Sequence, residues 1–158
     1  MTMREFSSIG AFIAHLATLE GRLALDSRAA LTDAAKLVEE QAKAEIGAYQ
    51  PAVGPFAAWP ELADSTKEDR ARKGYPENEP LLRTGDLRDS ISHEVHGLEA
   101  IVGSTEDVAL YQELGTQHIP PRPFLGTAAV VKEKEIVKLI GEQLAGTLAG
   151  VRYRIKGD

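Results

Sequence analysis

The four histidines of this chain, His15, His93, His96 and His118, are the side chains best suited to bind a metal or to act as a general base. His93 and His96 are three positions apart, a spacing that could hold one ion if both pointed the same way. They lie where apolar and polar residues alternate, which predicts a β-strand, and residues three apart in a strand point to opposite faces. We therefore expect no metal site. The absence of cysteine also excludes thiolate nucleophiles, disulfides and cysteine-based metal centres.

Ser90 is the candidate nucleophile, because His93 or His96 could serve as its base and Asp86 or Asp89 could orient that base. The Gly-x-Ser-x-Gly turn that presents many such serines is absent. The glycine-rich motifs that bind phosphates at the start of a helix are absent as well. We predict no catalytic residue and no bound cofactor. A small hydrolase that uses Ser90 or a histidine–carboxylate pair remains an alternative.

The segment Tyr111–Gly126, "YQELGTQHIPPRPFLG", contains three prolines in four positions. Each proline fixes φ near −65° and biases the preceding residue toward extended geometry, which predicts a stiff connector. Arg122 would then project from a rigid base and could pair with a carboxylate on a neighbouring subunit. In the other interpretation the connector only orients the last helix, with Phe124 and Leu125 in the core. The residues by themselves favour neither interpretation.

The elements that must position these residues begin with helices. Apolar residues recur at helical spacing over residues 9–19, after the N-cap hydroxyls of Ser7 and Ser8, and Gly21 is expected to end or break this helix. A second helix over 27–48 has an alanine-rich face, which permits close approach of a neighbour. Residues 49–80 are expected to be loop-rich and mobile around a short helix at 61–72. Trp59, within them, either packs in the core or anchors an interface.

The second half of the chain predicts a hairpin followed by a long helix. Apolar and polar residues alternate from Leu87 to Val95, His96 and Gly97 form the turn, and the alternation resumes over 98–102. A short helix over 108–114 ends at Gly115, and a long helix covers 127–148. The expected fold is a single α+β domain over residues 1–158, with N-terminal helices, a short antiparallel sheet with a β-hairpin and a long C-terminal helix.

The net charge of −6 over 158 residues argues against a partner recognised through its phosphates, because neutralising a polyanion needs clustered Lys and Arg. We expect no sequence-specific binding of nucleic acid. The mixed-charge tract Lys67–Lys73 is interpreted as a solvated helix face. The longest apolar-leaning run, Ile9–Leu19, is shorter than the ~20 residues of a bilayer span, and the first residues lack the pattern of a secretory signal. We expect a soluble protein made in a cytoplasm, with no membrane partner.

Four motifs occur in a characteristic order: "LLRTGDLRDSI" at 81–91, "IVGS" at 101–104, "LYQELGT" at 110–116 and "IPPRPFLGTA" at 119–128. In this order they resemble the head-tail joining or tail-completion (neck) family of long-tailed bacteriophages and the related Mu-like virion morphogenesis family. "WPELADST" at 59–66 is similar to a pattern that precedes the strands in the Mu-like group. The resemblance covers about residues 59–140.

This resemblance implies a structural virion protein without catalytic activity. It implies a homo-oligomeric ring, with six-fold symmetry suggested, at the head-tail junction or the upper end of the tail. The ring would contact neck, connector or tail-tube proteins, with DNA passing through it, after synthesis in the bacterial host cytoplasm. A monomeric peptide-binding adaptor that uses the hairpin edge is a further alternative. The residues expected at the assembly interface are Arg83, Arg88, Tyr111, Glu113, Gly115, Thr116, Pro120, Pro121, Arg122, Pro123 and Phe124.

Overall fold

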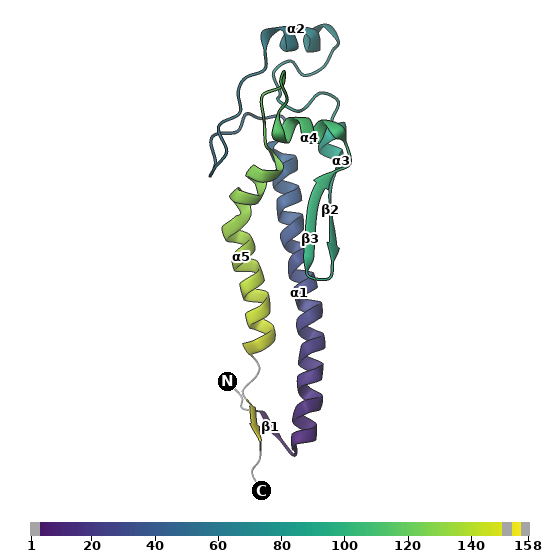
Figure 1. Cartoon of the computed structure of the whole chain (residues 1–158), viewed down its shortest axis with the longest axis vertical. Coiled ribbons are helices and arrows are strands. Elements are labelled where there is room, and N and C mark those ends of the chain that lie inside the picture. Colours follow the sequence, from purple (N-terminus) through teal and green to yellow (C-terminus); the bar gives the residue numbers. More distant parts are fainter. Residues whose placement is uncertain (1–3, 150–152, 156–158) are drawn as a thin grey trace.

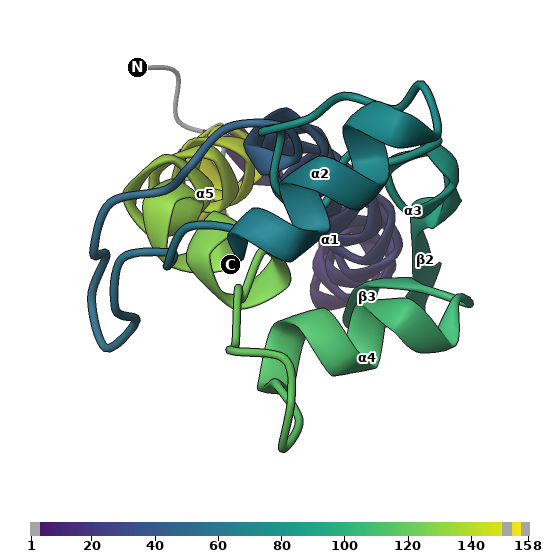
Figure 2. The same ribbon diagram turned by 90° about the horizontal axis from the view of Figure 1, so that it is seen from above.

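The computed structural model describes residues 4–149 and 153–155. The molecule is elongated, with two long helices, α1 (Ile9–Glu45) and α5 (Leu125–Ala149), side by side as a stalk (Figure 1). The short helices α2 (Asp64–Arg72), α3 (Asp86–Ser90) and α4 (Asp107–Leu114) gather with their loops at one end of the stalk. We call this end, residues 46–90 and 105–124, the apical region; Figure 2 shows it from above. The α+β fold expected from the sequence is confirmed.

α1 is one continuous helix, so the expected break at Gly21 and the separate second helix are wrong. Ser8 caps the helix as expected, since its hydroxyl accepts a hydrogen bond from the Ala11 amide at 3.1 Å. A glycine inside a helix costs only about 1 kcal/mol relative to alanine, and good helix formers on both sides of Gly21 offset this cost. At ~1.5 Å per residue, the 37 residues of α1 extend for roughly 55 Å.

The predicted alanine-rich face of α1 is buried. Ala30, Ala34, Ala35 and Ala42 are buried, and α1 packs against α5 over much of its length. Polar contacts add to this packing, because Asp33 accepts from Gln143 at 3.0 Å and Asp26 accepts from Thr147 at 2.5 Å. The core cluster lies where the stalk meets the apical region. Its buried members are Ala42, Ile46, Trp59, Leu87, Ile91, Ala109, Phe124 and Ala128.

The hairpin of β2 (Ile91–His96) and β3 (Glu99–Ser104) lies along α1 on the side away from α5 (Figure 1). The expected strand start at Leu87 is wrong, because α3 occupies Asp86–Ser90. Gly85, at φ +98°, caps this helical turn, which places Leu87 and Ile91 on one buried face, four residues apart. Asp89 is therefore an exposed helix residue rather than a residue of the strand.

Segment 49–80 is rich in loops, as expected, and α2 is its helix. The interpretation of Lys67–Lys73 as a wholly solvated face is wrong for Arg70, which is buried. Its Nη1 donates to the carbonyls of Pro76, Glu79 and Leu82 at 3.3, 2.6 and 3.0 Å. These bonds fix the chain beside Leu81, whose φ of +62° lies in the left-handed region that costs a leucine roughly 1–2 kcal/mol.

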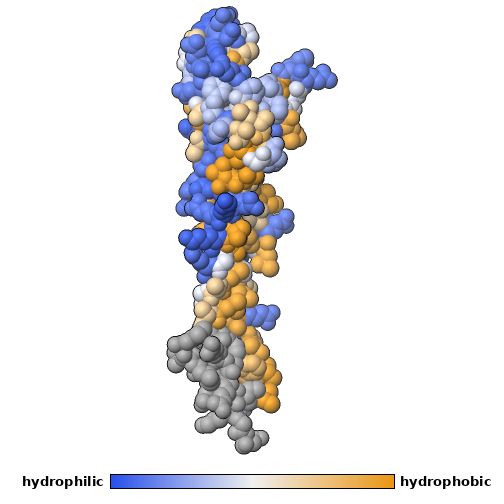
Figure 3. All heavy atoms as spheres, turned by 90° about the vertical axis from the view of Figure 1, so that its left-hand side faces the viewer, coloured by the Kyte–Doolittle hydropathy of each residue, from blue (hydrophilic) through white to orange (hydrophobic). Residues whose placement is uncertain are grey.

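At the far end of the stalk, β1 (Arg4–Phe6) pairs in parallel with β4 (Tyr153–Ile155). The pairing brings segments near the two ends of the sequence together, below the carboxyl end of α5 (Figure 1). The neighbouring stalk surface is apolar: in Figure 3, which faces the α5 side, apolar residues form a band down the stalk. The stalk is therefore only partly covered by the rest of its own chain.

Candidate assembly surface

Arg122 does not project from the proline connector toward a neighbour, which corrects the expectation from the sequence. Its side chain is 4% exposed, and it bonds instead to the segment that follows Trp59. Nε and Nη2 donate to the Pro60 carbonyl at 3.1 and 2.8 Å, and Nη2 also donates to the Glu61 carbonyl at 3.0 Å. Burial lowers the pKa of the Arg122 guanidinium from its ordinary value. Arg122 thus holds two distant loops together inside one subunit.

Phe124 and Pro123 are buried as well, so neither forms a free docking surface. Phe124 has no exposed surface and is the largest of the fully buried side chains. The Trp59 indole donates to the Pro123 carbonyl at 3.2 Å, which confirms the core interpretation of this tryptophan. The connector therefore orients α5 and fills the core, which is the second of the two interpretations that the sequence left open.

Glu113 caps the start of α5 rather than facing outward. Its carboxylate accepts from the amides of Phe124, Leu125 and Gly126 at 2.8, 3.0 and 2.8 Å. These amides would otherwise lack partners, and the negative charge suits the positive end of the helix dipole. The cap fixes α5 relative to α4.

A second carboxyl group, that of Glu45, lies at the same junction and is only 2% exposed. Glu45 and Thr127 Oγ1 form a hydrogen bond, and Thr127 Oγ1 also donates to the Pro123 carbonyl at 2.7 Å. A hydroxyl has only one hydrogen to donate. When Thr127 Oγ1 donates that hydrogen to the Pro123 carbonyl, its hydrogen bond with Glu45 requires a protonated carboxyl group that donates to Oγ1. Burial raises the pKa of Glu45, and the charge of Glu113 adds to this effect. The protonated acid is thus the form that suits this site.

Gly115 and Thr116 shape the connector from within. Gly115 has a φ of +76°, and a Cβ there would lie 2.9 Å from Pro121 Cδ, so glycine is required. The Thr116 hydroxyl accepts from the amides of His118 and Ile119 at 3.2 and 3.1 Å. Gly115 and Thr116 thus fix the backbone conformation of the connector to which they belong.

Arg83 and Arg88, which are also expected at the assembly interface, both have local partners. The Arg83 guanidinium lies 4.7 Å above the Tyr75 ring, and its Nη2 is 3.9 Å from Asp69 Oδ2. Arg88 Nε donates to Asp89 at 3.2 Å. Both arginines remain about half exposed, so these contacts leave room for a partner.

Other members of the expected interface are exposed. Tyr111 lies on the outer face of α4 with two exposed leucines, Leu110 and Leu114. Pro120 and Pro121 are exposed on the connector. Some of the residues expected at the assembly interface are therefore buried and hold the fold together, whereas others are exposed and could contact a partner.

An apical hollow of about 620 Å³ lies between α2, α3, α4 and the connector. Its lining mixes apolar side chains, including Leu81, Val108 and Ile119, with polar ones, including Arg83 and His118. The volume falls within the range of roughly 300–1,000 Å³ that is typical of binding sites. It is larger than a second hollow of about 440 Å³ that lies between α1 and α5.

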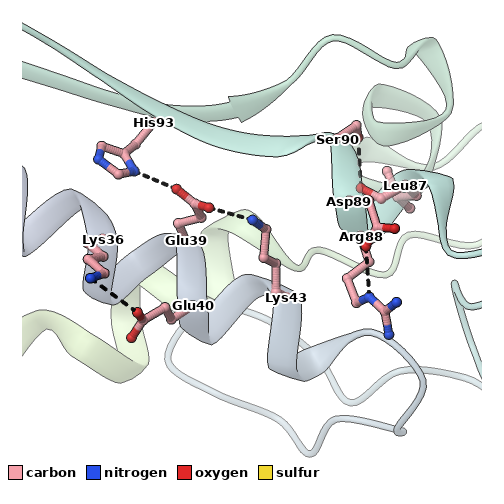
Figure 4. A network of polar contacts seen from close by, with 9 residues as sticks. All are labelled: Lys36, Glu39, Glu40, Lys43, Leu87, Arg88, Asp89, Ser90 and His93. Atoms are coloured by element: carbon pink, nitrogen blue, oxygen red, sulfur yellow. Dashed lines mark hydrogen bonds and ion pairs between the residues drawn. The ribbon is translucent and has the colours of Figure 1, made fainter.

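Of the residues of the hydrolase alternative, Figure 4 shows Ser90 bonded to Leu87 and His93 paired with Glu39 on α1. Ser90 Oγ donates to the Leu87 carbonyl at 2.7 Å and bonds Ser104 Oγ at 2.6 Å. His93 Nδ1 bonds Glu39 at 2.5 Å, and Glu39 also accepts from Lys43, which ties the hairpin to α1. These two hydrogen bonds, that from Lys43 first, lower the pKa of Glu39. Within residues 4–149 and 153–155, no three His, Asp or Glu side chains gather as a metal site requires.

Sequence reasoning missed Arg70, Glu45 and Thr127. Arg70 lies in a tract of mixed charge, and Glu45 follows a helix stretch rich in Glu, Gln and Lys, so neither differs locally from a solvated residue. One signal was available: Glu45 lies on the same helix face as Ala42, Val38 and Leu31, with successive gaps of three, four and seven residues, and this apolar stripe faces the core.

None of the helices in the described ranges is both long enough and apolar enough to span a membrane. No family model, curated protein or solved structure matches the chain.

Proposed function

We propose that this protein is a structural subunit that works by oligomeric assembly, without catalysis. The observation that carries the proposal is the amount of surface left uncovered. The chain exposes 10243 Å², roughly 2,400 Å² more than the ~7,800 Å² of a compact monomer of this mass. A typical interface buries about 800 Å² per partner, so the excess could supply more than one contact.

The exposed apolar side chains support this proposal by their position. On the amino-terminal turns of α1, Ile9, Ile13 and Leu16 recur at spacings of four and three and are exposed. This is the spacing by which helices pack against one another. On α4, Leu110, Tyr111 and Leu114 form a second exposed apolar face. Apolar groups at both ends of an elongated subunit are typical of surfaces that neighbouring chains cover.

The motif resemblance supplies the class of assembly. We infer a neck or tail-completion subunit of a tailed bacteriophage or a related particle, in a closed ring at the head-tail junction or the upper tail end. Six subunits, contacts with neck, connector or tail-tube proteins, and a place in the virion follow from the same resemblance. Among the residues expected at the interface, Tyr111, Thr116, Pro120 and Pro121 are exposed, as are Arg83 and Arg88, and these are our candidates for contact. Arg122 and Phe124 support them from inside.

The net charge of −6 agrees with a role around DNA that does not bind it tightly. A lining without clustered Lys and Arg gains little from counterion release, so a polyanion could slide past it. Passage of DNA through the ring is therefore part of the proposed function.

Light scattering coupled to size-exclusion chromatography tests the assembly. We expect a mass that is a multiple of the subunit mass and, in negative-stain electron microscopy, closed rings. A monomer at every concentration up to the solubility limit would refute the proposal. The phage assignment has its own test, because the gene should stand between genes for portal or capsid proteins and genes for tail-tube or tape-measure proteins.

A further inference from the structure

Residues 51–57, "PAVGPFA", form an uncharged loop beside the stalk, which we call the 51–57 loop. Reciprocal backbone hydrogen bonds between Val53 and Phe56, at 3.0 and 2.9 Å, close its tip. Two of its residues pack on α5. A Cβ added at Gly54 would lie 3.0 Å from Val130 Cγ1, and one added at Gly126 would lie 2.5 Å from the Phe56 ring. The loop is therefore a defined projection held against a rigid helix.

This projection is apolar yet mostly exposed. Five of its seven residues are exposed: Pro51, Ala52, Gly54, Pro55 and Ala57. There is no charged residue from Gly47 to Pro60, so burying the loop against a partner would desolvate no charge on the loop itself. Its two prolines and closed tip restrict the free chain, which reduces the conformational entropy lost on docking.

The 51–57 loop and the apical hollow lie at the same end of the molecule but on different sides of it. The loop projects past α5, whereas α3 and α4, which line the hollow, lie on the other side of α1 (Figures 1 and 2). A closed ring needs two different, complementary surfaces on each subunit, because its contacts are heterologous. A projection and a hollow at one end of an elongated chain meet this requirement, and they would set the stalks of neighbours side by side.

We propose that the 51–57 loop of one subunit occupies the apical hollow of the next copy in the ring, an inference that rests on the assembly proposed above. The hollow offers apolar contact through Val108 and Ile119. Arg83 and His118 line the same hollow and can donate to exposed loop carbonyls. Its volume of about 620 Å³ suits a short segment of small residues. A second copy is the occupant that supplies such a segment in every subunit of a ring.

Cysteine cross-linking tests the contact directly, because the chain contains no cysteine of its own. Full-length Ala52→Cys and Val108→Cys chains would be mixed and treated with a short bismaleimide. We expect a covalent dimer from the mixture and none from either variant alone, since a heterologous contact brings position 52 to position 108 and not to itself. The double variant should give a ladder that ends at the number of subunits in the ring.

Matched controls and a second pair keep the test decisive. Ala52→Cys with Val137→Cys, an exposed position on the stalk, should give no more product than unassembled chains. The pair Ala57→Cys and His118→Cys, both at exposed sites, repeats the test if the first pair fails to fold by circular dichroism. Assembled protein that yields no product above the control with a folded pair overturns this inference and leaves the assembly proposal standing. Protein that is monomeric throughout overturns both.

Discussion

At the scale of single residues, a few buried polar side chains fix the loops of the apical region. Arg70 and Arg122 are buried, and each bonds to backbone carbonyls of loops that no helix or strand would otherwise fix. A guanidinium carries five donors in a rigid fork, which suits it to gather several carbonyls at once. The Glu113 carboxylate, in turn, accepts hydrogen bonds from backbone amides at the start of α5. These residues hold the exposed surface in place rather than forming it.

Replacing Arg122 should therefore cost stability before it affects assembly. Arg122→Ala leaves the Pro60 and Glu61 carbonyls without their donor, and we expect a loss of about 2–4 kcal/mol in the free energy of unfolding. Urea denaturation followed by circular dichroism measures it. Arg88→Ala is the control, since Arg88 is half exposed and pairs with its neighbour Asp89, and its effect should stay within ~0.5 kcal/mol. Equal effects of the two changes would contradict a buried anchor at Arg122.

Glu45 gives a prediction with a definite pH dependence. Its pKa is raised by burial, so its contribution to stability is fully present below the ordinary value of 4.5 and is lost as the pH rises through the folded-state pKa. Glu45→Gln cannot ionise, so relative to the natural protein it should gain stability as the pH increases from 4.5 toward 8. Urea unfolding at several pH values measures the difference.

Glu39→Gln is the opposing control. The pKa of Glu39 is lowered, so its ionised form stabilises the fold above 4.5, and this contribution is lost as the pH falls through the folded-state pKa. The variant should be less stable than the natural protein at pH 7, and this deficit should shrink in acid. If the differences for Glu45→Gln and Glu39→Gln had the same sign and slope, the neutral state of Glu45 would be wrong.

At the scale of elements, backbone geometry in the connector decides how α4 and α5 meet. Gly115 ends α4 at a positive φ, and the chain then returns so closely that no Cβ fits beside Pro121. The Arg122 amide donates to the Gln112 carbonyl at 2.7 Å, which closes the connector onto α4. The prolines add stiffness to a loop that these contacts already shape.

Two glycine substitutions should therefore have opposite effects. Gly115→Ala places a side chain at a positive φ and 2.9 Å from Pro121, and we expect it to lower the free energy of unfolding by about 1–3 kcal/mol. Gly141 lies inside α5, and a Cβ added there would meet no other part of the chain within 4 Å, so Gly141→Ala should raise the free energy of unfolding by about 0.5–1 kcal/mol. Thermal and urea unfolding compare the two variants. Tolerance of alanine at 115 would show that the connector has another conformation.

At the scale of the whole molecule, the subunit is a long two-helix stalk with a loop-rich apical region, and its exposed surface exceeds what a compact chain would leave. If copies cover that surface, assembly stabilises the folded subunit by mass action. The melting temperature should then rise with protein concentration. Differential scanning calorimetry over a hundredfold range of concentration measures this, and a melting temperature independent of concentration would argue against coupled assembly.

The sequence by itself determined the local features of this protein. The Ser8 cap, the turn at Gly97 and the end of α4 at Gly115 follow from interactions within a few residues, and the structure confirms them. The α+β class follows from the order of the predicted elements and is confirmed as well. Near Leu87 the same local reasoning failed, because one helical turn and a strand both place Leu87 and Ile91 on one face.

Only the tertiary structure decided which side chains face the core. Arg122 meets Pro60 across 62 positions of sequence, and Thr127 meets Glu45 across 82. An arginine between prolines or a glutamate near a helix end has no local mark that separates a buried anchor from a solvated charge. The difference arises because burial depends on which distant segments the fold brings alongside, and no spacing within a single element encodes that.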